Sequence, residues 1–378
     1  MTSRPLSPKR LAKALLAFYD REGRSLPWRE MGVGNLYPIW LSEVMLQQTG
    51  VETVIPYFHR FLDRFPDLQS LARADTETVL SLWQGLGYYQ RGRNLHRAAR
   101  LVVEEMGGRI PHTREGLLKL PGIGPNTAAA ILAIGLNQPE AILDGNVKRV
   151  VARMIALDQP VSSKEGLARL WQAARAWTPA NRPGDYAQGI MDLGATLCTP
   201  RDPHCPRCPW QADCLGYRQG NPQAYPVANP KKKAQPKKIQ VTLLVRRGDG
   251  CLLLVERPAK GLLGGMWEPP GGEMGEPLSG RSSDPRSGQS SVWLQQQAEV
   301  LVQGLGLQVD RLGALPSVRH VFTHFQLTVY PFQSLYLGGT PRFQGERNHC
   351  WADSETLTCL PISTLHRKVL AHWSDGSP

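Results

Sequence analysis

The sequence predicts a multidomain protein in two parts, an all-α region followed by a smaller α+β domain. Three observations support this prediction. Residues 1–220 repeat apolar side chains three and four positions apart, as amphipathic helices do. The stretch GNPQAYPVANPKKKAQPKK follows, and its prolines and lysines are typical of an extended linker. Beyond it, β-rich runs alternate with two helical patterns.

We place the helical domain at 1–220, the linker at 221–238 and the second domain at 239–378. LAKALLAFYD, TVIPYFHRFLDRF, TETVLSLW and LHRAARLVVEEM are the clearest helical segments of the first part. In the second, IQVTLLV and CLLLVER are predicted strands joined by a hairpin turn at 248–250. VRHVFTHFQLTVYPF is also β-rich, whereas WLQQQAEVLVQGL and ISTLHRKVLAHW are predicted helices.

The charge balance favours a polyanionic partner. The chain has 44 Lys and Arg against 32 Asp and Glu, a net charge of +12, and basic side chains bind phosphate backbones by releasing counterions. No apolar run is long enough to cross a membrane, and no apolar stretch follows the basic start. We therefore expect no membrane contact and no secretory signal, but a monomer in the cytoplasm, associated with the nucleoid. Protein partners are not indicated.

Four of the seven cysteines crowd into residues 198–214 with the spacing C-x6-C-x2-C-x5-C. Such crowding suggests metal ligation rather than disulfides. Zinc sites more often have two paired C-x2-C knuckles, and one tight pair fits a single 4Fe–4S cluster better; zinc remains the alternative. The candidate ligands are Cys198, Cys205, Cys208 and Cys214.

Residues 117–135, LLKLPGIGPNTAAAILAIG, are predicted to form a helix, a glycine turn and a second helix. Gly122 and Gly124 permit unusual dihedrals and close backbone approach. Pro125 can begin the second helix, whose unpaired amides would attract a phosphate. The segment is similar to the helix–hairpin–helix motif of DNA repair enzymes. An ordinary interhelical turn is the alternative.

Two carboxylates are candidates for chemistry. Glu43, in WLSEVMLQQT, shares a helix face with apolar neighbours, so partial desolvation would raise its pKa towards that of a general acid. A surface glutamate beside an apolar stripe is the alternative. Asp144, in AILDGNVKRV, directly precedes a basic helix and suits an N-cap. It could also stabilise a developing cation, and capping amides would keep its pKa low.

Together, SEVMLQQT, LPGIGPNTA, LDGNVKRV, MDLGATLCTP and the cysteine loop resemble adenine DNA glycosylases, the MutY type of the endonuclease-III-like helix–hairpin–helix superfamily. The resemblance covers the whole helical part. It implies a base-excision-repair enzyme that hydrolyses the N-glycosidic bond of adenine mispaired with 8-oxoguanine or guanine in double-stranded DNA. It also implies one 4Fe–4S cluster on the four cysteines.

The resemblance assigns roles to individual residues. Glu43 would protonate the flipped adenine, and Asp144 would stabilise or trap the oxocarbenium ion. Gln48 and Tyr88 match positions that wedge side chains into the duplex, although Tyr88 could instead pack in the core as part of an aromatic patch. Gln188, in YAQGIMDLG, matches a position that contacts adenine.

Two positions of the helical part depart from the family pattern. Asn126 stands where lyase members of the superfamily have a nucleophilic lysine, and an amide cannot form a Schiff base. We therefore predict a monofunctional glycosylase. Adenine glycosylases often have Tyr or Ser at this position, and we count Asn126 among the residues predicted to bind the DNA or its base. Gly50 replaces a longer polar residue, which puts one DNA contact in doubt.

The second domain resembles a Nudix fold at GGMWEPPGGEMGE. The helix that should supply magnesium ligands has a single acid, Glu299, so we expect a degenerate Nudix-like domain without pyrophosphate hydrolysis. This domain resembles the one with which adenine glycosylases recognise 8-oxoguanine. HVFTH is similar to the family's lesion-sensing loop, usually Phe-Ser-His, with Thr323 in place of Ser. The resemblance implies that role for Phe322, Thr323 and His324. Otherwise Phe322 and His324 are alternate residues of a strand.

Two rival functions remain. One is a related glycosylase with lyase activity on oxidised pyrimidines, which Asn126 and the second domain disfavour. The other is a non-enzymatic iron–sulfur DNA-binding protein whose carboxylates are structural. A Glu43→Gln variant separates the latter from an enzyme, because an enzyme would lose base excision and keep much of its DNA affinity.

Overall fold

The computed structural model describes residues 7–228, 235–258, 261–274, 288–322, 324–345 and 347–372. The chain forms two compact units. The first consists of Met1–Ala74 and Arg91–Lys231, and the second of Asp75–Gln90 and Lys232–Pro378. By its packing, the segment 75–90 therefore groups with the second unit. The domain boundaries at 220 and 238 stay predictions.

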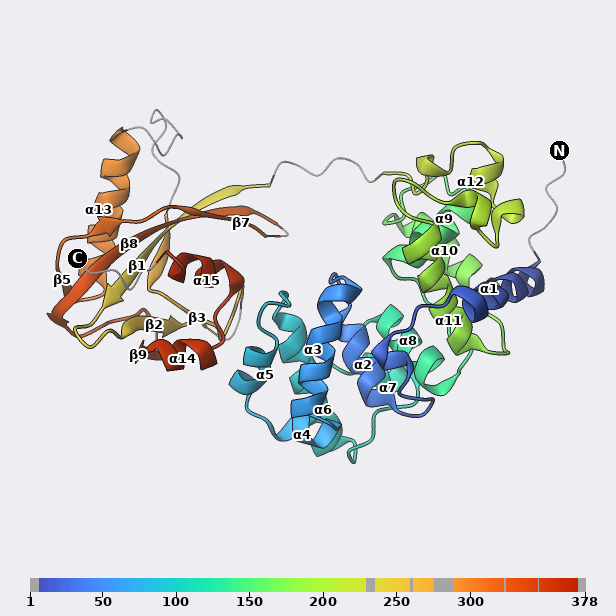
Figure 1. The fold of residues 1–378 in the computed structure, drawn as a ribbon, viewed down its shortest axis with the longest axis horizontal. Helices are drawn as coiled ribbons and strands as arrows, with labels where there is room; N and C mark the ends of the chain where they lie inside the picture. The colour runs from blue at the N-terminus through green and yellow to red at the C-terminus, as the bar shows by residue number, and fades with distance from the viewer. Residues whose placement is uncertain are drawn as a thin grey trace. The chain divides into compact units, whose positions relative to one another are not determined.

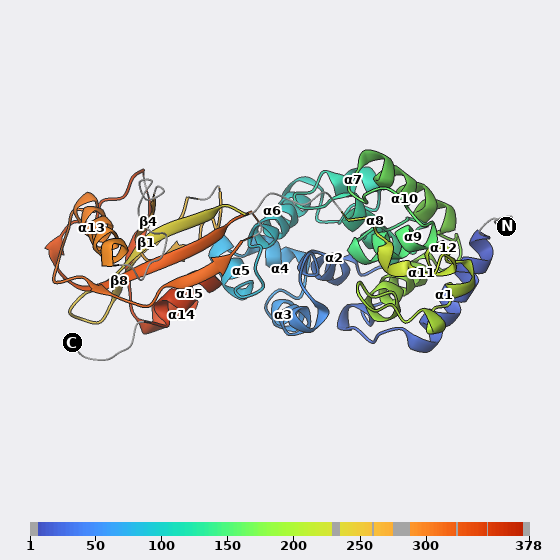
Figure 2. The same ribbon diagram turned by 90° about the horizontal axis from the view of Figure 1, so that it is seen from above.

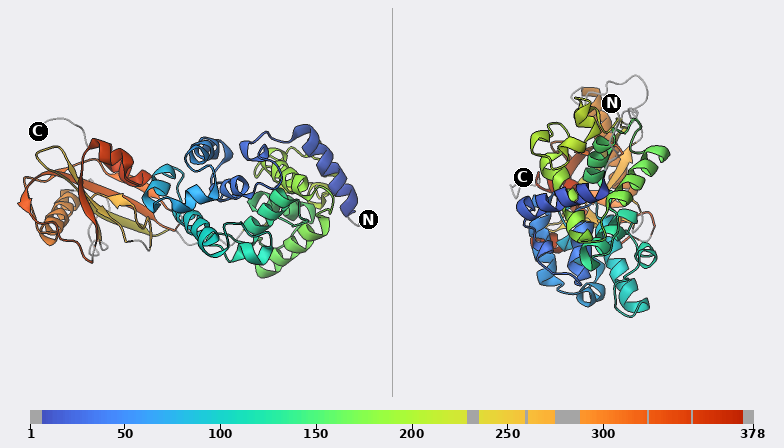
Figure 3. Two further views of the ribbon diagram at one scale, coloured as in Figure 1. Left: turned by 90° about the horizontal axis from the view of Figure 1, so that it is seen from below. Right: turned by 90° about the vertical axis from the view of Figure 1, so that its right-hand side faces the viewer.

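Among its described residues, the first unit contains helices and no strand (Figure 1 and Figure 3). The all-α prediction for this part is confirmed. None of the described helices has both the length and the apolar character needed to cross a bilayer. The elements are α1 Pro8–Glu22, η1 Pro27–Arg29, α2 Leu36–Met45, α3 Val51–Arg64, α4 Leu68–Arg73, α6 Gln90–Glu105, α7 Arg114–Leu118, α8 Pro125–Leu136, α9 Gly145–Met154, α10 Lys164–Trp177, α11 Pro183–Asp192, η2 Leu193–Leu197, η3 Cys205–Arg207, η4 Gln211–Asp213, α12 Leu215–Arg218 and η5 Pro222–Ala224.

The core of the first unit is arranged around α8. This helix is rich in alanine, and α2 and α11 both pack against it. Small side chains let the helices approach closely: a Cβ on Gly135 would lie 2.4 Å from Cδ2 of Leu36 in α2. Helix α8 therefore sets the position of α2, and its N-terminal turn lies beside the segment that leads into α9.

The second unit is a mixed sheet with helices. Its described strands form one nine-stranded sheet with the central order β3-β2-β1-β8-β5. The predicted hairpin at 248–250 is confirmed, because β1 and β2 pair antiparallel at Arg246 and Leu252. The elements are α5 Thr76–Leu82, β1 Lys237–Arg246, β2 Leu252–Glu256, β3 Trp267–Glu268, β4 Gly271–Met274, α13 Gly288–Gly304, β5 Leu307–Val309, β6 Gly313–Ala314, β7 Val318–Val321, β8 Gln326–Gly339, β9 His349–Ala352, α14 Ser354–Cys359 and α15 Thr364–Leu370.

Helices cover both faces of this sheet (Figure 2). Along β1, Leu243 packs in the cluster that contains α13, whereas Leu244 packs in the cluster that contains α15. Successive strand residues point to opposite faces, so β1 is buried on both sides. Strand β1 also runs parallel to β8 over its whole length. The predicted helices correspond to α13 and to α15, and the α+β prediction is confirmed.

Candidate active site

Glu43 is the residue of helix α2 that is partly exposed to solvent. Every residue of α2 is buried except Glu43, which is half-buried. Burial first, and then the charge of Asp144, raise the pKa of Glu43 to about 7 against the opposing effect of Arg29. A carboxyl with this pKa is protonated in about half of the molecules at neutral pH, and its protonated form can donate the proton. Glu43 is therefore more than a glutamate on a solvated surface.

Asp144 caps α9 and lies within electrostatic reach of Glu43. Its Oδ1 accepts a hydrogen bond of 2.6 Å from the Val147 amide, which confirms the N-cap. The expectation of a low pKa is wrong. Burial raises the pKa of Asp144 above its ordinary value, and the helix amides, Arg149 and Lys148 offset only part of that effect.

A buried ion pair that the sequence reasoning missed stands beside these carboxyls. Asp192 is fully buried and accepts two hydrogen bonds of 2.8 Å from the Arg29 guanidinium. It also accepts from the backbone amide and Nε of Arg24, at 2.9 and 2.7 Å. This pairing fixes the Arg29 cation where it lowers the pKa of Glu43. Asp192 lies in the sequence motif MDLGATLC. Its pairing with Arg29, which is distant in the sequence, is created only by the folded chain.

Asn126 uses its amide oxygen inside the protein. Its Oδ1 accepts a hydrogen bond of 2.6 Å from the backbone amide of Leu143, the residue before Asp144. The next residue, Thr127, accepts a hydrogen bond of 3.3 Å at Oγ1 from Gln47 Nε2, one helical turn beyond Glu43. The first turn of α8 thus contacts both segments that carry the carboxyls.

The predicted glycine turn joins α7 to α8. Gly122 has φ +80°, and a Cβ there would lie 2.8 Å from Cβ of Asn94, so a larger residue cannot replace it without movement. Gly124 caps α8, and a Cβ on it would meet open space. Pro125 begins the helix as expected. The open side of Gly124 leaves the first amides of α8 accessible to an anion.

Gln48 and Tyr88 share an unusual backbone. Both are exposed and have left-handed φ, +61° for Gln48 and +49° for Tyr88. Tyr88 is 46% exposed, whereas Trp83 and Tyr89 of the same aromatic patch are buried. The interpretation of Tyr88 as a core residue is therefore wrong. A strained backbone that presents a side chain to solvent is characteristic of functional positions.

Gln188 lies on α11 and is 9% exposed. Among the described residues, its Oε1 has no hydrogen-bond partner. A buried amide oxygen without a partner is costly, so a bound ligand that donates a hydrogen bond there would be stabilised.

The four loop cysteines come together beyond α11. Burial first, and then the neighbouring charges of Cys198, Cys214 and Cys205, raise the pKa of the Cys208 thiol to about 12. No three His, Cys, Asp or Glu side chains in the described ranges converge on one point as ligands of a single ion would. A cubane cluster binds each thiolate to a different iron and needs no such convergence. This donor set fits a 4Fe–4S cluster.

Arg153 holds the cysteine loop from inside. Its side chain is buried and donates to Cys198 Sγ at 3.3 Å, to the Thr199 carbonyl at 2.7 Å and to the Pro200 carbonyl at 2.9 Å. It also donates to the carbonyls of Pro222 and Tyr225, within and beside η5. These bonds fix the start of the range predicted as linker.

In the second unit, the HVFTH motif turns the chain between β7 and β8. Phe322 follows the last residue of β7, and its backbone amide bonds to the Phe325 carbonyl at 2.9 Å. His324 is exposed in the same turn, and Thr323 lies outside the described residues. The alternative of two alternate strand residues is therefore wrong, because the hairpin turn contains both described positions.

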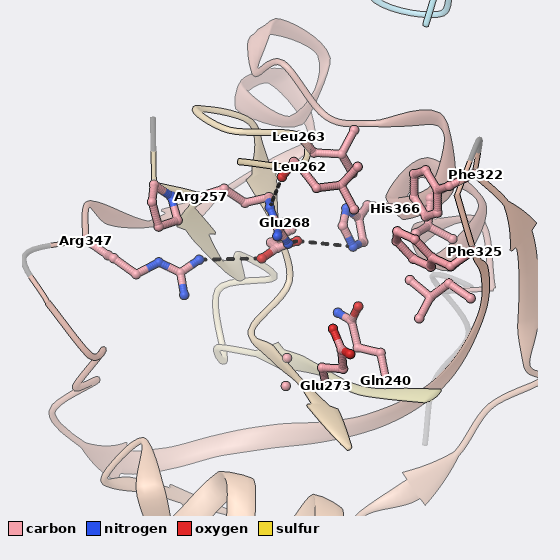
Figure 4. A pocket seen from close by; sticks show the side chains of 15 residues that line it. Gln240, Arg257, Leu262, Leu263, Glu268, Glu273, Phe322, Phe325, Arg347 and His366 are labelled. Carbon is pink, nitrogen blue, oxygen red and sulfur yellow. Dashed lines mark hydrogen bonds and ion pairs between the residues drawn. The ribbon is translucent and has the colours of Figure 1, made fainter. Parts of the chain in front are cut away.

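Phe322 also borders a cavity of about 200 Å³ in the second unit (Figure 4). The buried Glu268 lines this cavity. It accepts a hydrogen bond of 2.7 Å from Arg257 and lies 3.3 Å from His366 Nε2. Burial lowers the pKa of His366 to about 4, so this histidine is neutral at pH 7. The Glu268 carboxylate is thus paired with Arg257 inside the second unit.

Comparisons with known proteins agree with this geometry. Residues 41–175 match the HhH-GPD superfamily of base excision DNA repair proteins, and residues 241–372 match the NUDIX domain. The chain is 36% identical over 414 residues to adenine DNA glycosylase of Mus musculus, which spans 96% of this chain and 77% of that one. It is 35% identical over 420 residues to the adenine DNA glycosylase of Homo sapiens, with 97% and 74% covered.

Among solved structures, a thermostable thymine-DNA glycosylase superposes with a TM-score of 0.51 and 27% identity, over 56% of this chain and 97% of that chain. Identity to the curated relatives extends through both units. A half-buried acid, a helix–hairpin–helix and a cysteine loop lie in the part that matches the superfamily of repair proteins or directly follow it. The chain therefore belongs to the adenine DNA glycosylase family and is a DNA glycosylase of base excision repair.

Proposed function

We propose that this protein is a monofunctional glycosylase that removes adenine mispaired with 8-oxoguanine or guanine. The observation that supports this most is the pair of dissimilar carboxyls. Glu43, with a pKa of about 7 raised first by burial, can give a proton to the leaving base. Asp144, held at the N-terminus of α9, can stabilise the sugar cation that forms as the base departs.

The other residues predicted to bind DNA have supporting roles in this proposal. Gln48 and Tyr88 fill the space that the flipped adenine leaves in the duplex, because base flipping requires compensation for lost stacking. The Gln188 amide reads the edge of adenine with its unpaired Oε1. The Gly122–Gly124 turn and the first amides of α8 bind a backbone phosphate.

We assign the four loop cysteines to one 4Fe–4S cluster. When bound, the cluster would cross-link Cys198 to the segment 205–214 and stiffen the loop. Arg153 prepares this site by ordering the carbonyls beside Cys198. The exposed Arg207 and His204 then lie on a loop that can contact phosphate.

We assign recognition of the base opposite adenine to the hairpin turn that contains Phe322, Thr323 and His324. Phe322 is held by ring contacts with His320 and Phe325, at centroid distances of 4.6 and 4.8 Å. A Phe322→Ala variant should lose discrimination between 8-oxoguanine and guanine opposite adenine. The comparison is the ratio of the two single-turnover rates; an unchanged ratio contradicts this assignment. The cellular site of action, in the cytoplasm at the nucleoid, stays a prediction.

A labelled duplex with one adenine opposite 8-oxoguanine tests the proposal as a whole. The enzyme is incubated in excess, and the strands are analysed with and without hot alkali. Breakage only after alkali supports monofunctional excision. Breakage without alkali would reveal a lyase nucleophile, and absence of breakage in both would refute adenine excision. A matched duplex with thymine opposite adenine is the control.

A further inference from the structure

The first turn of α8 contains two neighbouring side chains that reach in different directions. Asn126 accepts a hydrogen bond of 2.6 Å from the amide of Leu143, which precedes Asp144. Thr127, which is 7% exposed, accepts one of 3.3 Å from the side chain of Gln47. Gln47 lies four residues after Glu43, beyond the C-terminus of α2.

The hydrogen bond from Leu143 to Asn126 has no ready substitute. Leu143 is 2% exposed, so its amide would be left without water if the Asn126 oxygen were removed, and a buried unpaired amide is unfavourable. The Leu143 amide also lies outside α9, which begins at Gly145. Helix hydrogen bonds therefore cannot take over, and the backbone before Asp144 would have to move to regain a partner.

We propose that Asn126 and Thr127 form a brace in which α8 fixes the separation between the Glu43 and Asp144 carboxyls. Asn126 is thus a positioning residue for the reaction rather than a group that contacts DNA. In this proposal the Asn126 side chain is engaged within the protein, in place of the DNA contact predicted from the sequence. The inference rests on the proposed roles of the two carboxyls.

The brace has an electrostatic consequence. Glu43 is faced by Asp144 from the start of α9 and by Arg29 from η1, and Asp144 in turn is faced by Arg149 and Lys148. The repulsion between two like charges falls as they separate. Loosening the brace should therefore weaken the influence of Asp144 on Glu43 while leaving the α2 surroundings of Glu43 unchanged.

The test compares Asn126→Leu, which removes the acceptor at similar volume, with Thr127→Val, which removes the hydroxyl at the other end. Asn137→Gly is the matched control. Asn137 Oδ1 accepts from the Gly184 amide at 3.2 Å at the opposite end of α8, and its left-handed φ of +52° suits glycine. The readouts are single-turnover excision across pH and affinity for a duplex with a 2′-fluorinated, cleavage-resistant adenosine.

We expect Asn126→Leu to lower the excision rate by about tenfold or more, because displacements near 1 Å are costly to catalysis. Its duplex affinity should stay within about twofold, and the alkaline limb of its rate profile should move to lower pH. Thr127→Val should change in the same direction. Asn137→Gly should keep the wild-type rate and profile. Wild-type rate and profile in both brace variants would overturn the proposal, as would an equal change in Asn137→Gly.

A second readout needs no activity. We would measure Tm as a function of pH for the wild-type protein and for the Glu43→Gln variant. The difference between the two pH profiles reports the proton affinity of Glu43 in the folded protein. The same difference, measured between Asn126→Leu and the double variant Asn126→Leu/Glu43→Gln, should be smaller. If the wild-type protein excises no adenine, the proposed function fails, yet this difference still tests the brace.

Discussion

The Glu43 carboxyl lies within electrostatic reach of Asp144, and burial followed by this neighbouring charge raises the pKa of Glu43 to about 7. Two carboxyls close together do not titrate alike when their surroundings differ. Glu43 is the half-buried residue of an apolar helix, whereas Asp144 accepts a hydrogen bond from the first turn of α9. One group therefore holds a proton under conditions in which the other is charged.

The excision rate should fall as pH rises above about 7. Glu43 then loses the proton that it must donate, so the single-turnover rate constant should drop by up to tenfold per pH unit. At low pH, protonation of Asp144 should lower the rate again, starting above the ordinary range for an aspartate because its pKa is raised. A rate that stays level from pH 7 to pH 9 would contradict Glu43 as the acid.

Glu43→Gln should stabilise the fold at alkaline pH. Between the ordinary pKa of 4.5 and about 7, folded Glu43 keeps a proton that the unfolded chain releases, so wild-type stability falls as pH rises through this window. The variant lacks this loss, on the order of 3 kcal/mol above pH 7. Thermal unfolding at pH 8 should show a raised Tm, with little difference at pH 4. A lowered Tm at pH 8 would refute the burial argument.

Asp144→Asn separates capping from charge. Asparagine is as good an N-cap as aspartate, so Tm should change little while the excision rate falls by about 100-fold or more with the lost charge. Asp144→Ala should lose the rate and about 1 kcal/mol of stability as well. Circular dichroism melts measure Tm, and single-turnover assays measure the excision rate. If the Asn variant retains full activity, Asp144 is only a cap.

Arg153→Met should impair loading of the iron–sulfur cluster. The variant leaves the carbonyls of Thr199 and Pro200 without their donor, which disorders the backbone beside Cys198 and costs on the order of 3 kcal/mol. Iron and acid-labile sulfide per chain should fall at least by about half. Arg169→Met, which removes a surface ion pair with Asp158, is the control. Full cluster content in Arg153→Met contradicts this role.

Local patterns predicted the elements well. The C-x6-C-x2-C-x5-C loop, the start of α8 at Pro125 and the hairpin at 248–250 all depend on residues close in sequence. Turn chemistry and helix periodicity act over such short ranges. Local patterns could not predict the parallel pairing of β1 with β8, because the paired residues, such as Lys237 and Gln326, lie almost 90 positions apart in the sequence.

The site shows the same division. Glu43 and Asp144 could be singled out from motifs, but the raised pKa of Asp144 depends on burial that only the packed fold creates. From the sequence, the capping amides suggested that the pKa of Asp144 would be lowered. Likewise, the bond between Asn126 and Leu143 spans 17 residues and has no sequence signature. Asp192 and Arg29 pair across an even longer separation.

The most direct test of the central claim is single-turnover excision by Glu43→Gln on the duplex with adenine opposite 8-oxoguanine, with its affinity measured on the 2′-fluorinated duplex. Glutamine keeps the size of the side chain and cannot give up a proton as an acid. We predict a rate at least about 100-fold below wild type, with affinity within about threefold. Wild-type excision by this variant would contradict Glu43 as the proton donor and with it the proposed mechanism.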